Sequence, residues 1–116
     1  MEQSAIFFDD DKQPWQDLGA GLKRKIMSYN ADVMVVKVQF EQDAVGTSHQ
    51  HPHTQVTYVA SGAFAYTVGA QTYTIHAGDS CYVPPNTVHG CRCIEKGVLI
   101  DVFSPMRADF LSESGR

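Results

Sequence analysis

The sequence has few cysteines, no long apolar run and no excess of basic residues. Its three cysteines are Cys81, Cys91 and Cys93, and an odd number cannot pair completely within one chain. We therefore expect free, buried thiols in a reducing compartment. No apolar run approaches the roughly 20 residues of a membrane span, and the polar start at residues 1–4 is unlike a signal peptide. These absences favour a cytoplasmic protein without a membrane partner.

Basic residues are too few and too scattered for nucleic-acid binding. Nine lysines and arginines stand against 13 acidic residues, which gives a formal charge of -4. Contact with a nucleic-acid backbone requires clustered cations that displace counterions, so no nucleic-acid partner is expected. The one basic run, Lys23-Arg24-Lys25, is interpreted as the solvated side of a strand or turn. At 116 residues the chain is long enough for a single domain, residues 1–116, with one core.

Most of the chain consists of short segments typical of β-strands. Between Val33 and Glu41, apolar and polar side chains alternate with the period of two that indicates a half-buried strand. Ser61-Gly62 is expected to close a hairpin, and Gly69-Ala70 fits a two-residue type II′ turn. Such strands, separated by glycine and proline, predict an all-β sandwich or small barrel. The expected strands cover residues 33–41, 55–60, 64–68, 72–76, 81–83, 88–93 and 97–103.

The two ends of the chain lack this alternation. Residues 1–21 are predicted to form an arm, held down by Trp15, that leads to the first strand. At the other end, Ser104 is a candidate N-cap and Pro105 a candidate first helical residue. Residues 104–111 are therefore expected to contain one short helix.

Histidines and an amide recur at every second position in the segment from His49 to Gln55. Alternate side chains of an extended strand point to the same face, so His49, His51 and Gln55 can converge with His89 from a neighbouring strand. We predict that these four side chains bind one divalent transition metal ion: Ni, Zn, Mn, Co or Fe. The alternative is a set of ordinary hydrogen-bonding histidines, which three imidazoles within five positions disfavour.

The two other histidines, His53 and His76, are not among the predicted metal ligands. Pro52 can turn His53 aside, so His53 is interpreted either as a support of the metal ligands or as a substrate contact. A solvent-facing histidine is an equal alternative there. His76 stands alone in a strand rich in threonine and tyrosine, and it is expected to be structural.

Two blocks of the sequence resemble the two motifs of the cupin superfamily. The first runs from Gly46 to Gly62, with glycine, His-x-His and an amide four residues later, and the second runs from Gly78 to His89. The resemblance implies a double-stranded β-helix, a small jelly-roll barrel with the ligands inside one end. Gln55 stands where many cupins have an acid, and Cys93 where an asparagine is common. Neutral ligands leave the cation its full charge, which suits a Lewis acid better than a redox centre.

The span from Trp15 to Leu111 is similar, more narrowly, to the pectin-degradation cupins of the KdgF type. That resemblance implies conversion of 4,5-unsaturated monouronates, released from pectin or alginate, into linear keto forms. In those proteins an Asp-x-Phe-x-x-x-Arg motif is implicated in activity. It corresponds here to Asp101, Phe103 and Arg107.

Apart from the resemblance, the residue types of this motif suit the conversion of a sugar acid. Asp101 interrupts an otherwise apolar strand, and a buried carboxylate must be paired or shifted toward its neutral form. We expect Asp101 to act as general acid and base, and Arg107 to bind the substrate carboxylate. Phe103 and Tyr66 are expected to pack against the sugar ring. The alternatives are a structural Asp101 and an Arg107 that pairs with Asp109 or Glu113.

Two other functions fit the same ligand set. An Fe-dependent cupin dioxygenase uses a histidine-rich site with open positions, although Gln55 in place of a carboxylate weighs against it. A non-catalytic sugar-binding cupin would hold the ligand without turning it over. Analogy with small cupins leads us to expect a homodimer.

Overall fold

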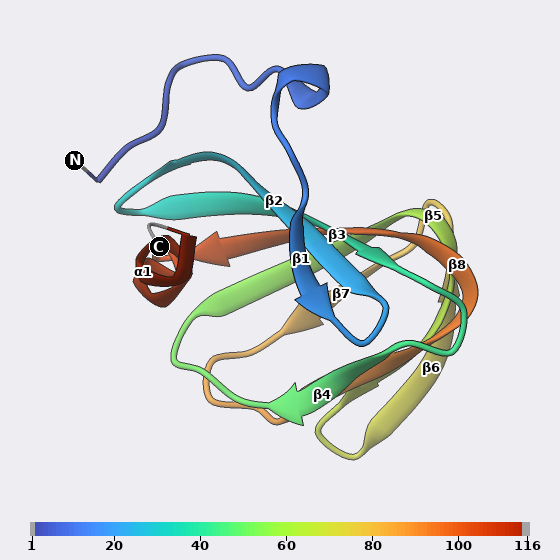
Figure 1. Ribbon diagram of the computed structural model, residues 1–116. Helices are drawn as coiled ribbons and strands as arrows, with labels where there is room; N and C mark the ends of the chain where they lie inside the picture. Colours follow the sequence, from blue (N-terminus) through green and yellow to red (C-terminus); the bar gives the residue numbers. More distant parts are fainter. Residues whose placement is uncertain (1, 115–116) are drawn as a thin grey trace.

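The computed structural model describes residues 2–114, in which eight strands form a sheet that rolls around a central core (Figure 1). All pairings between these strands are antiparallel, as expected for an all-β chain with short connections. The elements are η1 (Asp10–Lys12), β1 (Gln16–Gly19), β2 (Leu22–Asn30), β3 (Val33–Phe40), β4 (Val45–His49), β5 (Thr54–Val68), β6 (Gln71–His76), β7 (Ser80–Val83), β8 (His89–Ser104) and α1 (Ala108–Ser114).

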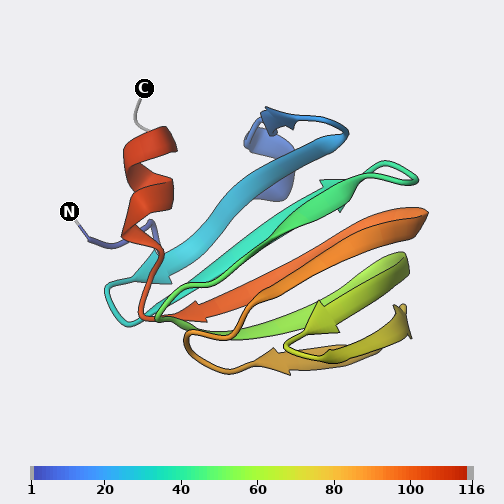
Figure 2. The ribbon, with the colours of Figure 1, turned by 90° about the horizontal axis from the view of Figure 1, so that it is seen from below.

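Strands β5 and β8 organise the fold, because each is long enough to serve both halves of the roll. The second half of β8 lies between β3 and the first half of β5, and β7 pairs with that same part of β5. The first half of β8 lies between β4 and the second half of β5, which in turn pairs with β6. Figure 2 shows β2, β3, β8 and β5 side by side in this order. The resulting shape is the double-stranded β-helix that the sequence predicts.

The predicted hairpin at Ser61-Gly62 is wrong, and so is the division of β8 into two strands. β5 continues through Gly62 without a turn, with register shifts against β8 on both sides of it. Gly62 has a φ of +83°, and a Cβ there would lie 2.5 Å from the carbonyl oxygen of Glu95. Only glycine fits this bulge, which bends the strand from one half of the roll into the other. The turn predicted at Gly69-Ala70 is confirmed, since Val68 pairs with Gln71.

The core lies between the two halves of the roll. In β3 every second side chain is buried, which confirms the alternation that the sequence shows between Val33 and Phe40. Phe40 and Phe64 meet edge to face across the core, with ring centroids 5.2 Å apart. The other buried side chains of this cluster include Met34, Val36, Val38, Val59, Ile75, Val83, Cys93, Leu99 and Phe103.

The N-terminal arm has more structure than the sequence predicts, since it contains η1 and β1. Trp15 holds it as expected, with the ammonium groups of Lys25 and Lys37 4.8 and 5.8 Å from the Trp15 ring centre. Both ammonium groups also bind Asp10 Oδ1, at 3.0 and 2.7 Å. The solvated face predicted for the basic run is wrong: Arg24 is 4% exposed and Lys25 is 8% exposed.

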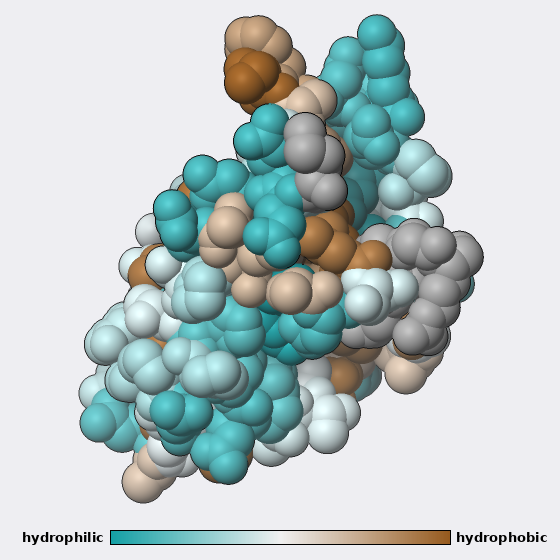
Figure 3. Space-filling model, turned by 90° about the vertical axis from the view of Figure 1, so that its left-hand side faces the viewer, coloured by the Kyte–Doolittle hydropathy of each residue, from teal (hydrophilic) through white to brown (hydrophobic). Residues whose placement is uncertain are grey.

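The C-terminal helix exists but begins later than residue 104. Ser104 still belongs to β8, where it pairs with Thr54, so it does not cap a helix. Met106 is buried, and its N–H donates to the carbonyl oxygen of Ala31. The helix α1 begins only at Ala108. Figure 3, which views the molecule from the side of α1, shows apolar atoms in separated places among hydrophilic ones. Within residues 2–114, no helix combines the length and apolar character needed to cross a bilayer.

Candidate metal centre and its cavity

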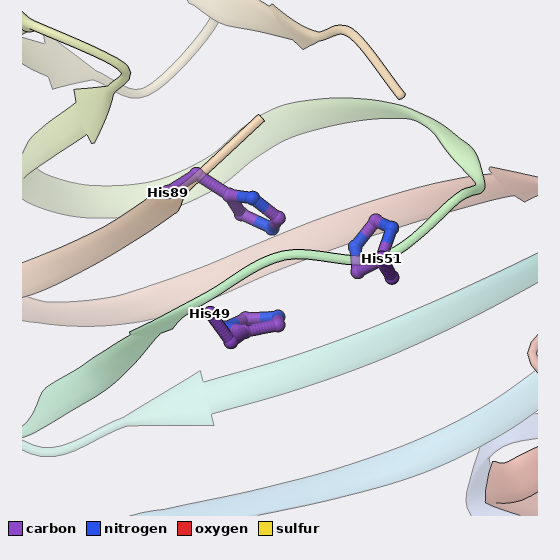
Figure 4. Close-up of side chains that lie close together, drawn as sticks. All are labelled: His49, His51 and His89. Atoms are coloured by element: carbon purple, nitrogen blue, oxygen red, sulfur yellow. The ribbon is translucent and has the colours of Figure 1, made fainter. Parts of the chain in front are cut away.

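Three histidines from separate segments meet at one end of the roll (Figure 4). His49 ends β4, His51 follows in the loop, and His89 begins β8, where it pairs directly with His49. The ring centroids of His49 and His89 are 4.4 Å apart, and that of His51 is 5.5 Å and 4.9 Å from them. One ligand atom from each ring lies within 4.8 Å of the others. Nitrogens bound to one ion about 2.1 Å away lie at most about 4.2 Å apart, so small shifts of these rings bring all three to a common ion.

Backbone carbonyls fix the tautomers of two of these rings. His49 Nδ1 lies 2.8 Å from the Thr47 oxygen, and His89 Nδ1 lies 2.8 Å from the Thr87 oxygen. A carbonyl only accepts, so each Nδ1 carries the proton and each Nε2 presents a lone pair. Among the described side chains, His89 Nε2 is a buried atom without a hydrogen-bond partner. A bound cation would satisfy it.

Gln55 adds an oxygen to the cluster. Its Oε1 lies 2.9 Å from His51 Nε2, and the side chain is only 3% exposed. Two ligands about 2.1 Å from one ion and at right angles to each other are roughly 3.0 Å apart. The Gln55 oxygen and the His51 nitrogen therefore lie close enough together to bind the same ion. The predicted set His49, His51, Gln55 and His89 is brought together by the fold.

Burial keeps the inner histidines neutral, which is the form that binds a metal. Removal from water and, next in size, the charge of Arg107 lower the pKa of His51 to about 4. Burial also lowers the pKa of His89. A cation would therefore displace no proton from either ring at neutral pH.

A cavity of about 290 Å³ opens beside the cluster. His49, His89 and Gln55 line one side of it, and the remaining wall is largely apolar. Since one water occupies about 30 Å³ in the liquid, this volume corresponds to about ten waters. The cavity therefore has the scale of a single sugar ring.

Asp101 projects into this cavity from the second half of β8. It retains part of its accessible surface because it lines the cavity, and Thr57 Oγ1 donates to its Oδ1 at 2.7 Å. Burial raises the pKa of Asp101 to about 6, while the Thr57 hydrogen bond and then the charge of Arg107 act in the opposite direction. A carboxyl that titrates near neutral pH beside a metal site is suited to proton transfer.

Two arginines line the cavity near α1. Arg107 immediately precedes the helix, and its Nε and Nη2 donate to Asp109 at 3.1 and 3.0 Å. Its guanidinium carbon lies 4.2 Å from the centre of the Phe110 ring, and that of Arg24 lies 4.1 Å from the same ring. Arg24 also donates from Nε to Gln16 Oε1 at 2.9 Å. Stacking on Phe110 holds both cations in fixed positions at the cavity wall.

This chain is similar to known proteins in sequence and in architecture. The pattern of the cupin domain matches residues 36–103, more than half of the chain. The chain belongs to the cupin family. Over 107 residues this cupin is 45% identical to the pectin degradation protein KdgF of Dickeya dadantii, which covers 90% of this chain and 97% of that protein. It is thus a cupin of the KdgF type, as the sequence indicates.

Two solved structures share both fold and sequence with this cupin. An RmlC-like cupin from Shewanella frigidimarina has a TM-score of 0.92 and 43% identity, over 95% of this chain and 99% of that one. KdgF from a Halomonas species has a TM-score of 0.89 and 38% identity, over 92% and 99%.

His53 lies beside the cavity of this cupin rather than among the side chains that line it. Its Nε2 donates to the Met106 carbonyl oxygen at 3.1 Å, and its ring is 5.2 Å from that of His51. This favours the interpretation of His53 as a support of the metal ligands, because it ties the loop that carries His51 to the segment that carries Arg107. His76, expected to be structural, is exposed near Asp79.

Arg24 and Thr57 were not among the predicted site residues. Both could have been found from a period of two, because Arg24 shares a face with Leu22 and Ile26, and Thr57 shares one with Gln55. Tyr66 and Phe103, which were predicted to face the substrate, both line the cavity.

Proposed function

We propose that this cupin uses a divalent cation to open 4,5-unsaturated monouronates into linear keto-deoxyuronates, an isomerisation. The observation that carries the proposal is Asp101, a carboxyl with a raised pKa in the wall of the cavity that His49 and His89 also line. The relationship to KdgF supports pectin as one source of the substrate, and alginate yields a sugar acid of the same class.

The substrate is an enol ether closed as a hemiacetal. Its double bond joins C4 to C5, and C5 also carries the carboxylate and the ring oxygen. Removal of the proton from the C1 hydroxyl breaks the bond between C1 and the ring oxygen, which leaves an aldehyde at C1 and an enolate at C5. Transfer of a proton to C4 turns that enolate into a ketone. The proton lost at O1 balances the one gained at C4, so no oxidant or reductant is needed.

Asp101 is the group placed to move that proton. With a pKa of about 6 in the metal-free site, it is mostly ionised at pH 7 and can accept the proton from O1. The resulting carboxylic acid can then deliver a proton to C4. A cation bound by His49, His51, Gln55 and His89 supplies positive charge that stabilises developing negative charge on the sugar oxygens.

The arginines and aromatic rings give the cavity its preference for a sugar acid. Arg107 uses two of its five N–H donors on Asp109, and the others suit the carboxylate at C5. Arg24 adds a second buried positive charge to the same wall. Phe103 is 2% exposed and, with Tyr66, offers an apolar surface to the sugar ring.

The proposal is tested with freshly generated 4,5-unsaturated galacturonate. The conjugated double bond absorbs in the ultraviolet, so its decay follows ring opening directly. We expect wild-type protein with added metal to accelerate the decay, and Asp101→Ala or a chelator to remove the acceleration. Asp32→Asn, which changes an exposed acid in a turn, serves as the control and should retain full activity. A decay no faster than the spontaneous reaction would exclude this function.

The same variants separate the two other functions. A dioxygenase would consume oxygen when loaded with Fe(II), and we expect no uptake during uronate turnover. If the protein is a sugar-binding cupin, wild type and Asp101→Ala should bind the uronate equally well, and neither protein should turn it over. Binding retained with turnover lost only in the variant supports the enzyme.

We also propose that the protein is a cytoplasmic homodimer. The three cysteines are free thiols, which fits a reducing compartment. The outer face of the sheet carries an apolar row across four strands: Val35 pairs with Val102, Val102 with Val56, and Val56 with Tyr82. Val56 is 43% and Tyr82 is 58% exposed, so a second copy of this face could bury them.

A further inference from the structure

A chain of side-chain hydrogen bonds links Gln55, which lies beside the histidine cluster, to Asp101. His51 Nε2 lies 2.9 Å from Gln55 Oε1, and Gln55 Nε2 donates to Thr57 Oγ1 at 2.9 Å. Thr57 Oγ1 in turn donates to Asp101 Oδ1 at 2.7 Å. Thr57 is fully buried and Gln55 nearly so, which means that water does not compete for these bonds.

The direction of each bond in this chain follows from proton counting. A hydroxyl has one proton, and the ionised carboxylate of Asp101 can only accept. Thr57 therefore gives its proton to Asp101 and turns a lone pair toward Gln55. Only the amide nitrogen of Gln55 can donate to that lone pair. The carboxamide oxygen must then point the other way, toward His51 and the cation.

This orientation matters because Gln55 has two unlike ends. With the carboxamide reversed, an NH₂ group would face the cation and the metal would lose an oxygen ligand. The ring orientations of His49 and His89 are already fixed by backbone carbonyls. Gln55 also donates to the Tyr66 hydroxyl at 3.3 Å. A phenol can donate as well as accept, so that longer bond does not select one orientation.

We propose that Thr57 is a positioning residue that sets the orientation of the Gln55 carboxamide. It transmits the hydrogen-bond polarity of Asp101, so the carboxylate assigned to proton transfer also keeps the ligand oxygen directed at the metal. This inference rests on the metal site of the proposed function and does not depend on its uronate chemistry. Metal binding can therefore test it whether or not the protein turns over a uronate.

Metal affinity is measured for folded wild-type protein and three variants by competition of Zn²⁺ against a chromophoric chelator. Thr57→Val keeps the side-chain shape but removes the hydroxyl, and we expect a 10–100-fold loss of affinity, the usual effect of losing a hydrogen-bond partner of a ligand. Thr57→Ser keeps the hydroxyl and should stay within about threefold of wild type. Thr67→Val is the matched control, because Thr67 lies on the same strand and its hydroxyl bonds the Thr72 hydroxyl on the β5–β6 hairpin.

The decisive comparison repeats Thr57→Val in a Gln55→Glu background. A carboxylate presents an oxygen whichever way it turns, so there the loss of affinity should fall below about threefold. Equal losses in the two backgrounds, or a folded Thr57→Val protein with wild-type affinity, would overturn the inference. Failure of wild-type protein to bind Zn²⁺ would overturn the metal site itself. Dependence on Thr57 without uronate turnover would support this inference and count against the proposed function.

Discussion

Replacing Asp101 by asparagine should stabilise the metal-free protein while it abolishes activity. The carboxyl lies in a largely apolar cavity, where its charged form is disfavoured by loss of water. Asparagine has nearly the same shape, keeps an oxygen that accepts from Thr57 and carries no charge. A residue retained for chemistry at a cost in stability behaves in this way.

The magnitude follows from the pKa of Asp101, which rises from 3.8 to about 6 on folding. A tenfold change in an ionisation constant is worth about 1.4 kcal/mol, so the ionised form destabilises the folded state by about 3 kcal/mol. Because the folded-state pKa is the higher one, the unfolded chain loses its proton first as the pH rises. The contribution of Asp101 to the stability of the wild type therefore falls between pH 3.8 and about 6 and stays constant above that.

Urea unfolding with a chelator present measures this effect without interference from a cation. At pH 7.5 we expect Asp101→Asn to unfold with a free energy about 1–3 kcal/mol higher than wild type. The difference should shrink to about half at pH 5 and to less than about 1 kcal/mol at pH 4. Asp32→Asn, in an exposed turn, should follow wild type at each pH.

An Asp101→Asn protein that is less stable than wild type at pH 7.5 would refute this reasoning. It would mean that the carboxylate is well paired in the folded state and has a structural role. A stabilisation that does not depend on pH would also contradict it, because the ionisation of Asp101 would then not be the cause.

The remaining predictions concern the ligands, the arginines and the apolar outer face. His89→Ala should lower metal affinity more than about 100-fold, because removing a ligand weakens binding more than removing a hydrogen-bond partner of a ligand. Metal analysis after dialysis measures this loss, and His76→Ala should retain the metal. Arg107→Met should raise the KM for the uronate roughly tenfold or more, because a hydrogen bond to a charged group contributes about 1.5–3 kcal/mol, whereas the exposed Arg92→Met should not. Light scattering should give twice 12.8 kDa, or 25.6 kDa, and Val56→Lys should reduce it to the monomer; a wild-type monomer would contradict the dimer.

Local periodicity was sufficient to group three of the four predicted metal ligands. His49 and His51 alternate with Gln50, and the strand period places them on one face together with Gln55. The approach of His89 could not be derived from periodicity alone, because it depends on which strands are neighbours. The resemblance to cupins supplied that pairing, and the direct pairing of His49 with His89 confirms it.

Glycine positions were harder to interpret, because glycines with positive φ occur both in turns and in bulges. Gly69 closes a hairpin and Gly62 bends a continuous strand, although both have positive φ. The difference lies in distant pairing with β8, which the local sequence does not contain. The same holds for Ser104, which pairs with Thr54 instead of capping a helix.

Charge patterning misled the interpretation of Arg24. The basic run suggested a solvated face, yet the period of two alone would have placed Arg24 on the inner face between Leu22 and Ile26. Its burial depends on Phe110 and Gln16, which lie far from it in the sequence or on another strand. A buried arginine beside a ligand cavity is therefore found only when the strand period is given more weight than the charge run.

The metal site is tested most directly by the position of the cation, determined by anomalous diffraction from crystals grown with Ni²⁺ or Zn²⁺. We predict one main anomalous peak, about 2.1 Å from a nitrogen of each of His49, His51 and His89 and at similar distance from Gln55 Oε1. Asp101 should face the same cavity. A cation bound elsewhere, or one that Gln55 meets through its nitrogen end or not at all, would contradict this prediction.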